Sequence, residues 1–181
     1  MILVGEMRDL ETIGTALTAA ETGHLVFGTL HTQSAPSTID RIIDVFPAEQ
    51  QEQVRIQIAS SLQGVVTQAL VPTLDGQGRV PSLEILLPND AVRNLIRQGK
   101  VEQIYSVMQT NTTRGMQTME QSLGDLIQRG VIRFEEGMSR SSEPAQLVGI
   151  LERAGFQIPE ETTGLQDDTP PLSPTLRVAG S

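Results

Sequence analysis

Two polar side chains that could act on a phosphate each follow a short apolar run. Glu6 comes directly after residues 1–5, MILVG, and His31 comes directly after residues 25–30, LVFGTL. An apolar strand that ends in Gly-Glu is typical of a Walker B segment, because ATP hydrolysis needs a rigidly held carboxylate to hold Mg²⁺ through its waters or to orient the attacking water. A neighbouring imidazole could contact the γ-phosphate and respond to its presence. The pattern makes Glu6 and His31 candidate catalytic residues, with Glu6 also a candidate ligand of magnesium through water.

Residues suited to lie near phosphate surround this pair: Gly5, Arg8, Thr29 and Thr32. The glycine would let the backbone approach a nucleotide closely, and the two hydroxyls flank the histidine. The arginine could contact phosphate or metal-bound water, and a surface ion pair is an equally open alternative. The residues alone also leave open a solvated Glu6 at a strand end and a loop His31 that bonds only to backbone. The other histidine, His24, begins the second apolar run and is predicted to be structural.

These side chains can meet only if the two apolar runs are adjacent parallel strands. Residues 2–6 and 25–30 are predicted to be those strands, and Leu10–Thr22 is the predicted crossover helix, N-capped by Asp9 and ended by Gly23. Strand, helix, strand with tight connections is the unit of a parallel sheet, whose active groups gather at the carboxyl ends of the strands. A buried central strand rarely opens a domain, so a start on such a strand predicts that the preceding part of the fold is missing.

The rest of the chain is predicted to be mostly helical around one hairpin. Strands are expected at 65–71 and 81–87, joined by the turn Asp75-Gly76-Gln77-Gly78. Helices are expected at 37–46, 47–62, 88–97, 101–109, 115–129 and 144–154. After Phe156 the sequence is rich in Pro, Thr, Asp, Glu and Gly, so residues 157–181 are predicted to be a disordered tail. The predicted division is an α/β core at 1–87, a helical region at 88–156 and this tail.

Composition argues against several kinds of partner and compartment. The 181 residues carry a net charge of −9 and no Cys, so we expect no broad electrostatic grip on nucleic acid, no disulfide framework and no thiolate zinc site. No apolar run approaches the roughly 20 residues of a membrane span, and the N-terminus does not read as a signal peptide. These features predict a cytoplasmic protein without a transmembrane segment. With 38% apolar and 3% aromatic residues the core is lean, which suggests that some apolar surface meets another segment or subunit.

Several segments, in the right order, resemble the twitching-motility retraction ATPases of the PilT family. GEMRD at 5–9 resembles the family's Walker B region, and GHLVFGTLHT at 23–32 resembles its histidine box. The resemblance continues through STIDRIIDVFP at 37–47, QQEQVRIQIASSLQGVV at 50–66 and GMQTM at 115–119. The segment similar to the family's AIRNLIRE motif, which is tied to retraction, is Ala91-Val92-Arg93-Asn94-Leu95-Ile96-Arg97-Gln98. Its two arginines, four positions apart, are predicted to form a basic stripe on one exposed helix face that meets a neighbouring subunit or a pilus base protein, and a merely solvated face is the alternative. The likeness covers residues 1 to about 140.

The resemblance implies a fold, cofactors and partners. The fold would be α/β, the C-terminal half of a P-loop (RecA-like) ATPase sheet at 1–87, followed by the small helical region and the tail. The cofactors would be ATP and Mg²⁺, with Glu6 as the Walker B carboxylate, His31 near the γ-phosphate and residues 91–98 as the retraction motif. Family members are homohexameric rings at the cytoplasmic face of the inner membrane, so a hexamer peripheral to that membrane and pilus platform proteins as partners are expected. Related assembly ATPases usually carry a four-cysteine zinc site, so the absence of Cys favours the retraction branch.

The departures from the family pattern concern phosphate binding. No G-x-x-x-x-G-K-[ST] loop occurs in the sequence, and the family's acidic box and N-terminal PAS-like domain are missing. Because the amides and Lys of that loop supply much of the electrostatic stabilisation of phosphoryl transfer, the 181 residues alone are predicted to be inactive. Gln98 replaces the motif's final acid, and Val92 replaces an isoleucine. The function expected is part of a hexameric motor that couples ATP hydrolysis to pilus retraction and twitching. The alternatives are a catalytically dead interaction or oligomerisation module that associates with full-length subunits, or part of a related pilus assembly or type II secretion ATPase.

Overall fold

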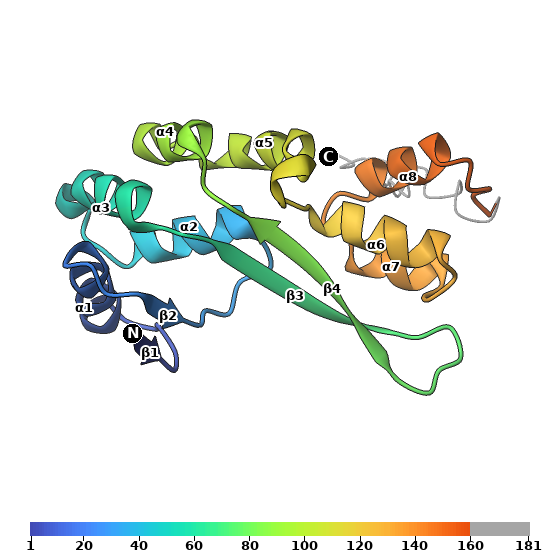
Figure 1. Cartoon of the computed structure of the whole chain (residues 1–181), viewed down its shortest axis with the longest axis horizontal. Coiled ribbons are helices and arrows are strands. Elements are labelled where there is room, and N and C mark those ends of the chain that lie inside the picture. Colours follow the sequence, from blue (N-terminus) through green and yellow to red (C-terminus); the bar gives the residue numbers. More distant parts are fainter. Residues whose placement is uncertain (160–181) are drawn as a thin grey trace, which may run out of the picture.

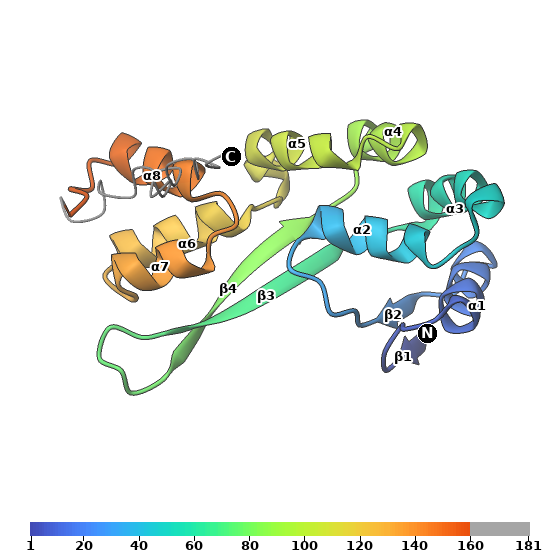
Figure 2. The same ribbon diagram turned by 180° about the vertical axis from the view of Figure 1, so that it is seen from behind.

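A long antiparallel hairpin connects the two ends of the molecule. In this computed structural model, which describes residues 1–159, strands β3 (Val65–Pro72) and β4 (Arg79–Leu86) run diagonally between two groups of helices (Figures 1 and 2). One end holds β1 (Ile2–Val4), α1 (Leu10–Glu21), β2 (Val26–Gly28), α2 (Ala35–Asp44) and α3 (Ala48–Ser61). The chain continues through α4 (Asp90–Gln98), a 3-10 turn (Val101–Gln103), α5 (Ile104–Thr110) and a second 3-10 turn (Thr112–Arg114). The other end holds α6 (Met119–Gln128), α7 (Phe134–Arg140) and α8 (Pro144–Arg153).

The first three elements form the predicted strand, helix, strand unit. β1 pairs with β2 in parallel, with Ile2 opposite Val26. The pairing continues past the strand ends, where the Met7 amide donates to the Thr29 carbonyl at 2.9 Å. Asp9 caps the crossover helix α1, and its carboxylate accepts from the amide of the third helical residue at 2.9 Å. The predicted adjacent parallel strands with a crossover helix are therefore confirmed.

β1 is exposed, although its apolar run predicts a buried strand. Met1 and Leu3 are 88% and 78% exposed, and Phe27 of β2 is 51% exposed. The reason is that β1 and β2 form a sheet of two strands, which offers little area for other described elements to pack against, so its faces are only partly covered. The helix between the strands, α1, packs Ile13 into the core, whereas the apolar side chains of Leu3 and Phe27 remain open to solvent.

The predicted hairpin is confirmed with shifted bounds. β3 and β4 are antiparallel, with Val65 opposite Leu86 at one end and Pro72 opposite Arg79 at the other. The second strand is expected at 81–87 and is observed at 79–86. Proline is typical of a first strand residue, but Pro81 lies inside β4, opposite Leu70. The turn between the strands is closed by its own side chains, as Asp75 accepts from the hydroxyl of Thr73 at 2.6 Å.

Helix starts differ from the expectation where side chains cap the backbone. The helix expected at 37–46 is α2 at Ala35–Asp44, because Ser34 and Ser37 form a reciprocal capping box at its start. The helix expected at 115–129 is α6, which begins at Met119 because the preceding Gln117 pairs with β4.

Two further differences concern short helices. The segment expected as one helix at 101–109 is a 3-10 turn followed by α5. The seven-residue α7 was not predicted, because its length and its central Gly137 leave little periodic signal. The expected tail at 157–181 lies outside the described residues apart from its first three positions.

Two hydrophobic clusters hold the described residues together. The first joins α1 to α5 and includes Leu86 of β4, and the second packs α6 to α8 against Val71 of β3. The first cluster contains residues on both sides of position 87, so the division of the chain at 87 and 88 stays a prediction. Among residues 1–159, no helix combines the length and apolarity needed to cross a bilayer.

Candidate functional site

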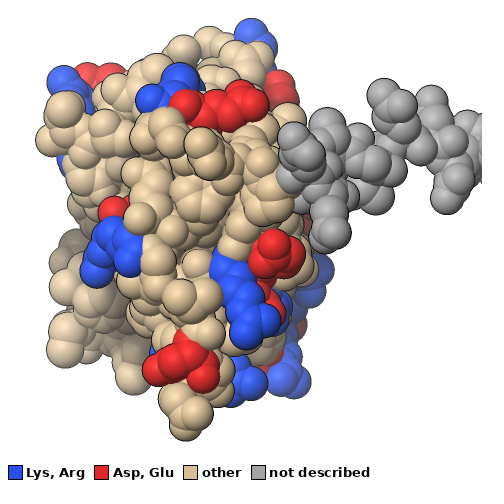
Figure 3. All heavy atoms as spheres, turned by 90° about the vertical axis from the view of Figure 1, so that its right-hand side faces the viewer, with Lys and Arg blue, Asp and Glu red and all other residues tan. Residues whose placement is uncertain are grey.

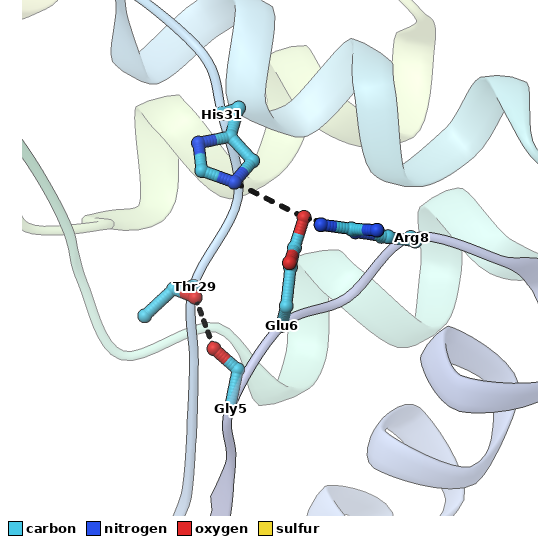
Figure 4. Close-up of polar contacts among 5 residues, drawn as sticks. All are labelled: Gly5, Glu6, Arg8, Thr29 and His31. Atoms are coloured by element: carbon cyan, nitrogen blue, oxygen red, sulfur yellow. Dashed lines mark hydrogen bonds and ion pairs between the residues drawn. The ribbon is translucent and has the colours of Figure 1, made fainter.

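Glu6 and His31 meet just beyond the carboxyl ends of β1 and β2. Nε2 of His31 lies 3.0 Å from Oε1 of Glu6, and Nε of Arg8 donates to the same oxygen (Figure 4). The side chains of His31 and Arg8 are 84% and 75% exposed, so a ligand can reach both. The hydrogen bond from Arg8, together with the positive charge of that side chain and the contact with His31, holds the pKa of Glu6 below its ordinary value. The site therefore presents an ionised carboxylate with two accessible donors directed at it.

The backbone beneath this cluster is held by Thr29 and left open at Gly5. The Thr29 hydroxyl donates to the Gly5 carbonyl, which ties the two strand ends together (Figure 4). A Cβ at Gly5 would meet nothing within 4 Å, whereas a Cβ at Gly28 would lie 2.8 Å from the sulfur of Met7. A side chain at Gly28 would thus require the flexible end of Met7 to shift, whereas Gly5 leaves free space beside the carboxylate.

Thr32 faces away from the cluster. Its hydroxyl lies 2.7 Å from that of Thr38 in α2, whose hydroxyl donates to the Ser34 carbonyl at 2.8 Å. His24 is bonded to the hydroxyl of Thr22 at 3.2 Å, at the amino end of β2. Of the predicted residues, the structure brings together Gly5, Glu6, Arg8, Thr29 and His31. Thr32 fixes the following loop to α2 instead.

A groove of about 780 Å³ extends from His31 along α2, and its lining is acidic. Carboxylates at Asp40, Asp44 and Glu102 line it, with Arg41 as an opposing charge. Burial raises the pKa of Asp40, and the nearby Asp44 and Glu102 raise it further. Because like charges repel, this groove is a poor phosphate site, and the accessible edge at His31 is the better one.

One carboxylate stands at the cluster where a metal is expected. Within the described part of the chain, no group of three His, Asp or Glu side chains is placed to hold a metal ion. A magnesium ion at Glu6 would therefore need waters and phosphate oxygens for its remaining positions, which suits an ion that keeps several waters.

The segment 91–98 forms most of α4, and its charged face differs from the expectation. Val92 and Ile96 are fully buried, and Leu95 packs against them from the edge. Arg93 donates from Nη1 to the carbonyl of Ala59 at 2.5 Å and from Nη2 to that of Leu62 at 3.1 Å. The predicted two-arginine stripe is therefore not a free surface, because Arg93 is occupied at the C-terminus of α3.

The remaining residues of this segment face solvent: Ala91, Asn94, Arg97 and Gln98. The helix itself begins and ends by local rules, with Asn89 accepting from the Val92 amide at 3.0 Å and Gly99 in the left-handed conformation at φ 68°. Arg97 is thus the basic side chain of the motif that a partner could contact.

Sequence reasoning missed two buried carboxylates. Glu84 of β4 is 2% exposed and Glu120 of α6 is 0% exposed. Glu120 accepts from the Tyr105 hydroxyl at 2.8 Å and from the Ser141 hydroxyl at 3.0 Å. Burial and this bond to Glu120 raise the pKa of Tyr105, which keeps the phenol protonated as a donor. The signal for Glu84 was present in the sequence, because it alternates with the inward residues Ser82 and Leu86.

Charges on the end of the molecule formed by α6 to α8 are mixed. Figure 3 shows that face, on which basic and acidic side chains alternate among uncharged ones. At the C-terminal end of α6, Arg129 and Asp125 form an ion pair at 2.9 Å. A mixed face of this kind lacks the single-sign field that steers nucleic acid.

Comparisons with known proteins agree on one group of relatives. A family model described as type II/IV secretion system protein matches residues 1–80. A twitching motility protein of Neisseria gonorrhoeae is 60% identical over 141 residues, which cover 78% of this chain and 38% of that protein. The type IV pilus retraction ATPase PilT of Pseudomonas aeruginosa is 54% identical over 144 residues, covering 80% and 42%. The crystal structure of the pilus retraction motor PilT with bound ADP has a TM-score of 0.74 at 54% identity and covers 82% of this chain and 41% of that one. The chain thus spans about two-fifths of the length of these relatives.

Proposed function

We propose that this chain, a member of the PilT family of type IV pilus retraction ATPases, is part of a motor that retracts pili. It would supply the sheet edge that carries Glu6 and His31, at which ATP is hydrolysed. The structural likeness to PilT also confirms the predicted fold class, an α/β part of a P-loop ATPase followed by a helical region. The observation that supports the proposal most strongly is the 3.0 Å contact between His31 and Glu6 beyond two adjacent parallel strands. Active groups of parallel sheets gather at this edge.

The three charged or polar side chains can divide the work of hydrolysis. Phosphate oxygens are strong acceptors, so a bound γ-phosphate competes with Glu6 for the donors of Arg8 and His31. Once those donors move to phosphate, the carboxylate is free to orient a water for attack or to bind metal-bound water. Mg²⁺ with ATP, when bound, would supply the metal and the phosphoryl group that is transferred to water. Glu6 would hold the metal through water, and His31 would contact the terminal phosphate.

The residues present fit one end of a nucleotide. The Glu6 cluster offers donors and a carboxylate for a terminal phosphate, and Gly5 leaves open space beside it. The phosphate-binding loop that would hold the other phosphates does not occur in the 181 residues. The chain alone is therefore proposed to be inactive, and turnover needs a segment or subunit that carries such a loop.

Assembly and location follow from the family as proposals. The exposed apolar side chains of β1 and β2 and the lean core are suited to contact with further protein. We propose a hexameric ring at the cytoplasmic face of the inner membrane, peripheral to it, acting on platform proteins of the pilus.

A second function is favoured by the missing loop. A chain that has the sheet edge with Glu6 and His31 but no phosphate-binding loop could associate with full-length subunits and not hydrolyse ATP itself. In that case it would act as an interaction or oligomerisation module. Membership in an assembly or secretion ATPase is the other alternative, and the absence of Cys weighs against it.

The test is to supply what the chain lacks. We define the complemented protein as the part of the Pseudomonas aeruginosa relative that precedes the stretch matched by this chain, joined in frame to residues 1–181. Residues 1–181 alone should show no ATPase activity above background, and the complemented protein should hydrolyse ATP and restore twitching to a strain without its retraction ATPase. A folded, ADP-binding complemented protein without turnover would favour the interaction module.

A further inference from the structure

Glu84 is a buried carboxylate between the first turns of two helices. It lies on the inner face of β4 and is 2% exposed. The Ala35 amide at the start of α2 donates to its Oε1 at 2.5 Å, and the Met119 amide at the start of α6 is near enough to the same carboxylate to lower its pKa. The Thr67 hydroxyl adds a longer contact at 3.4 Å. Since a buried carboxylate is costly unless its oxygens are bonded, its place at this junction needs an explanation.

The two helix starts are well suited to hold a negative charge. The first amides of a helix have no acceptor within the helix, and the partial positive charge of the helix end favours an anion. Burial raises the pKa of Glu84, and the bond from the Ala35 amide and the nearby Met119 amide oppose that rise. One carboxylate therefore joins elements that belong to the two ends of the molecule (Figure 1).

A short chain of contacts leads from Glu84 to His31. Ala35 follows His31 by four positions, and the residues between them are fixed to α2. Ser34 forms the capping box of that helix, and the Thr32 hydroxyl lies 2.7 Å from that of Thr38. Thr32 and Ser34 therefore cannot move without breaking a bond to α2, whose first amide is held by Glu84.

On its other side, Glu84 is linked to α6 through its own strand neighbours. The amide of Ile85 donates to the Gln117 carbonyl at 2.8 Å, and the Gln117 amide returns a bond at 2.9 Å. The side-chain amide of Gln117 also donates to the Leu83 carbonyl at 2.7 Å. Gln117, two residues before α6, is thereby tied to β4 at the two positions on either side of Glu84.

We propose that Glu84 is a positioning residue that holds the His31 loop and links it to the C-terminal helices through the first turns of α2 and α6. This proposal rests on the proposed function of His31 as the residue near the terminal phosphate. Glu84 acts through His31 and does not touch the nucleotide. A change at the phosphate that moves His31 is transmitted to α6 by the same bonds.

The variant that tests this is Glu84→Gln in the complemented protein. Gln keeps the size and one acceptor oxygen, but its amide nitrogen can no longer accept from the second helix start. A displaced catalytic group costs rate more than binding, so we expect kcat to fall roughly tenfold with the KM for ATP within about twofold. The control is Glu102→Gln, the same chemical change at an exposed position of the neighbouring groove, which should leave kcat within about twofold.

A double-mutant cycle with His31→Ala separates positioning from a general structural role. If Glu84 acts through His31, the double variant should be no slower than His31→Ala alone. Independent, multiplying losses in kcat would overturn the proposal, as would a Glu84→Gln enzyme as fast as the Glu102→Gln control.

Amide hydrogen exchange on residues 1–181 tests the Glu84 bridge without a variant or ATPase activity. First-turn amides usually exchange fast, and Ala48 at the start of α3, which has no side-chain cap, provides the reference. The Ala35 and Met119 amides should exchange at least about tenfold more slowly than that of Ala48, in keeping with a stable bond. Exchange of either at the reference rate would overturn the bridge even if the complemented protein hydrolyses ATP. Slow exchange with no hydrolysis would leave the bridge standing and contradict the proposed function instead.

Discussion

Glu6 lies between two donors, so a phosphate that binds to those donors would change the hydrogen bonds of the Glu6 carboxylate. In this structure Arg8 and His31 both bond to its carboxylate. Their side chains are largely exposed, so they can turn to a ligand at little cost in packing. The ionised carboxylate of Glu6 is thus paired with the two donors that we propose contact the phosphate. This arrangement gives each of the three side chains a separate test.

Replacing His31 with Ala should slow hydrolysis in the complemented protein. The imidazole is the donor closest to Glu6 after Arg8, and loss of a donor that contacts the terminal phosphate should lower kcat by about 10²-fold. His24→Ala is the matched control, because that histidine lies at the amino end of β2 and bonds to Thr22. Steady-state rates would contradict the assignment if both histidine variants lost the same activity.

Gly5→Ala should weaken nucleotide binding without unfolding the chain. An added Cβ meets nothing within 4 Å in this structure, so thermal unfolding should change by less than about 0.5 kcal/mol. In the complemented protein, a nucleotide that packs against the Gly5 backbone would meet the new methyl group. The Kd for ADP should therefore rise roughly tenfold, which is about 1.4 kcal/mol of binding free energy. Gly149→Ala, in α8 with equally open space, is the control for calorimetric titration. Equal ADP affinity in both variants would exclude close approach at Gly5.

Among the elements, α4 has a different role from the one its sequence motif suggests. Its arginines are four positions apart and were expected to share one exposed face. Arg93 instead binds the last carbonyls of α3, where a positive charge also complements the helix end. Segment 91–98 therefore contains one residue that joins two helices, Arg93, and one that remains exposed, Arg97.

Arg93→Ala should destabilise the chain. It removes charged hydrogen bonds to the carbonyls of Ala59 and Leu62, which should lower the free energy of unfolding by about 2 kcal/mol. Arg93→Lys keeps the charge but cannot span both carbonyls, so it should restore part of this loss. Chemical denaturation of residues 1–181 measures the difference, and an unchanged midpoint for Arg93→Ala would show that these bonds contribute nothing.

Arg97→Ala should leave stability and ATP hydrolysis nearly unchanged and abolish pilus retraction. The side chain is exposed, so its removal should alter unfolding by less than about 0.5 kcal/mol. If it contacts a neighbouring subunit or a platform protein, the defect lies in coupling, and twitching of a strain that carries the complemented protein should be lost. Normal twitching by this variant would show that the exposed half of the motif is not an interaction surface.

For the whole molecule, sequence patterns predicted the parts that depend on local rules. The parallel strands, the crossover helix and the cluster at their carboxyl ends follow from apolar runs and one capping residue, Asp9. The patterns failed where contacts distant in sequence decide. Arg93 reaches α3, and the start of α6 is set by pairing with β4. The exposure of β1 is another such case, because burial depends on neighbours that a local run does not specify.

We propose that Glu6 acts on the attacking water or the metal, and not on the adenine or ribose. The most direct measurement compares Glu6→Gln with wild type in the complemented protein, by steady-state ATP hydrolysis and by ADP titration. Glu11→Gln in the first turn of α1 is the control for removal of an exposed negative charge nearby. We predict that Glu6→Gln abolishes turnover and leaves the Kd for ADP within about threefold, while Glu11→Gln changes neither. Loss of ADP affinity equal to the loss of rate, or wild-type turnover by Glu6→Gln, would contradict the account.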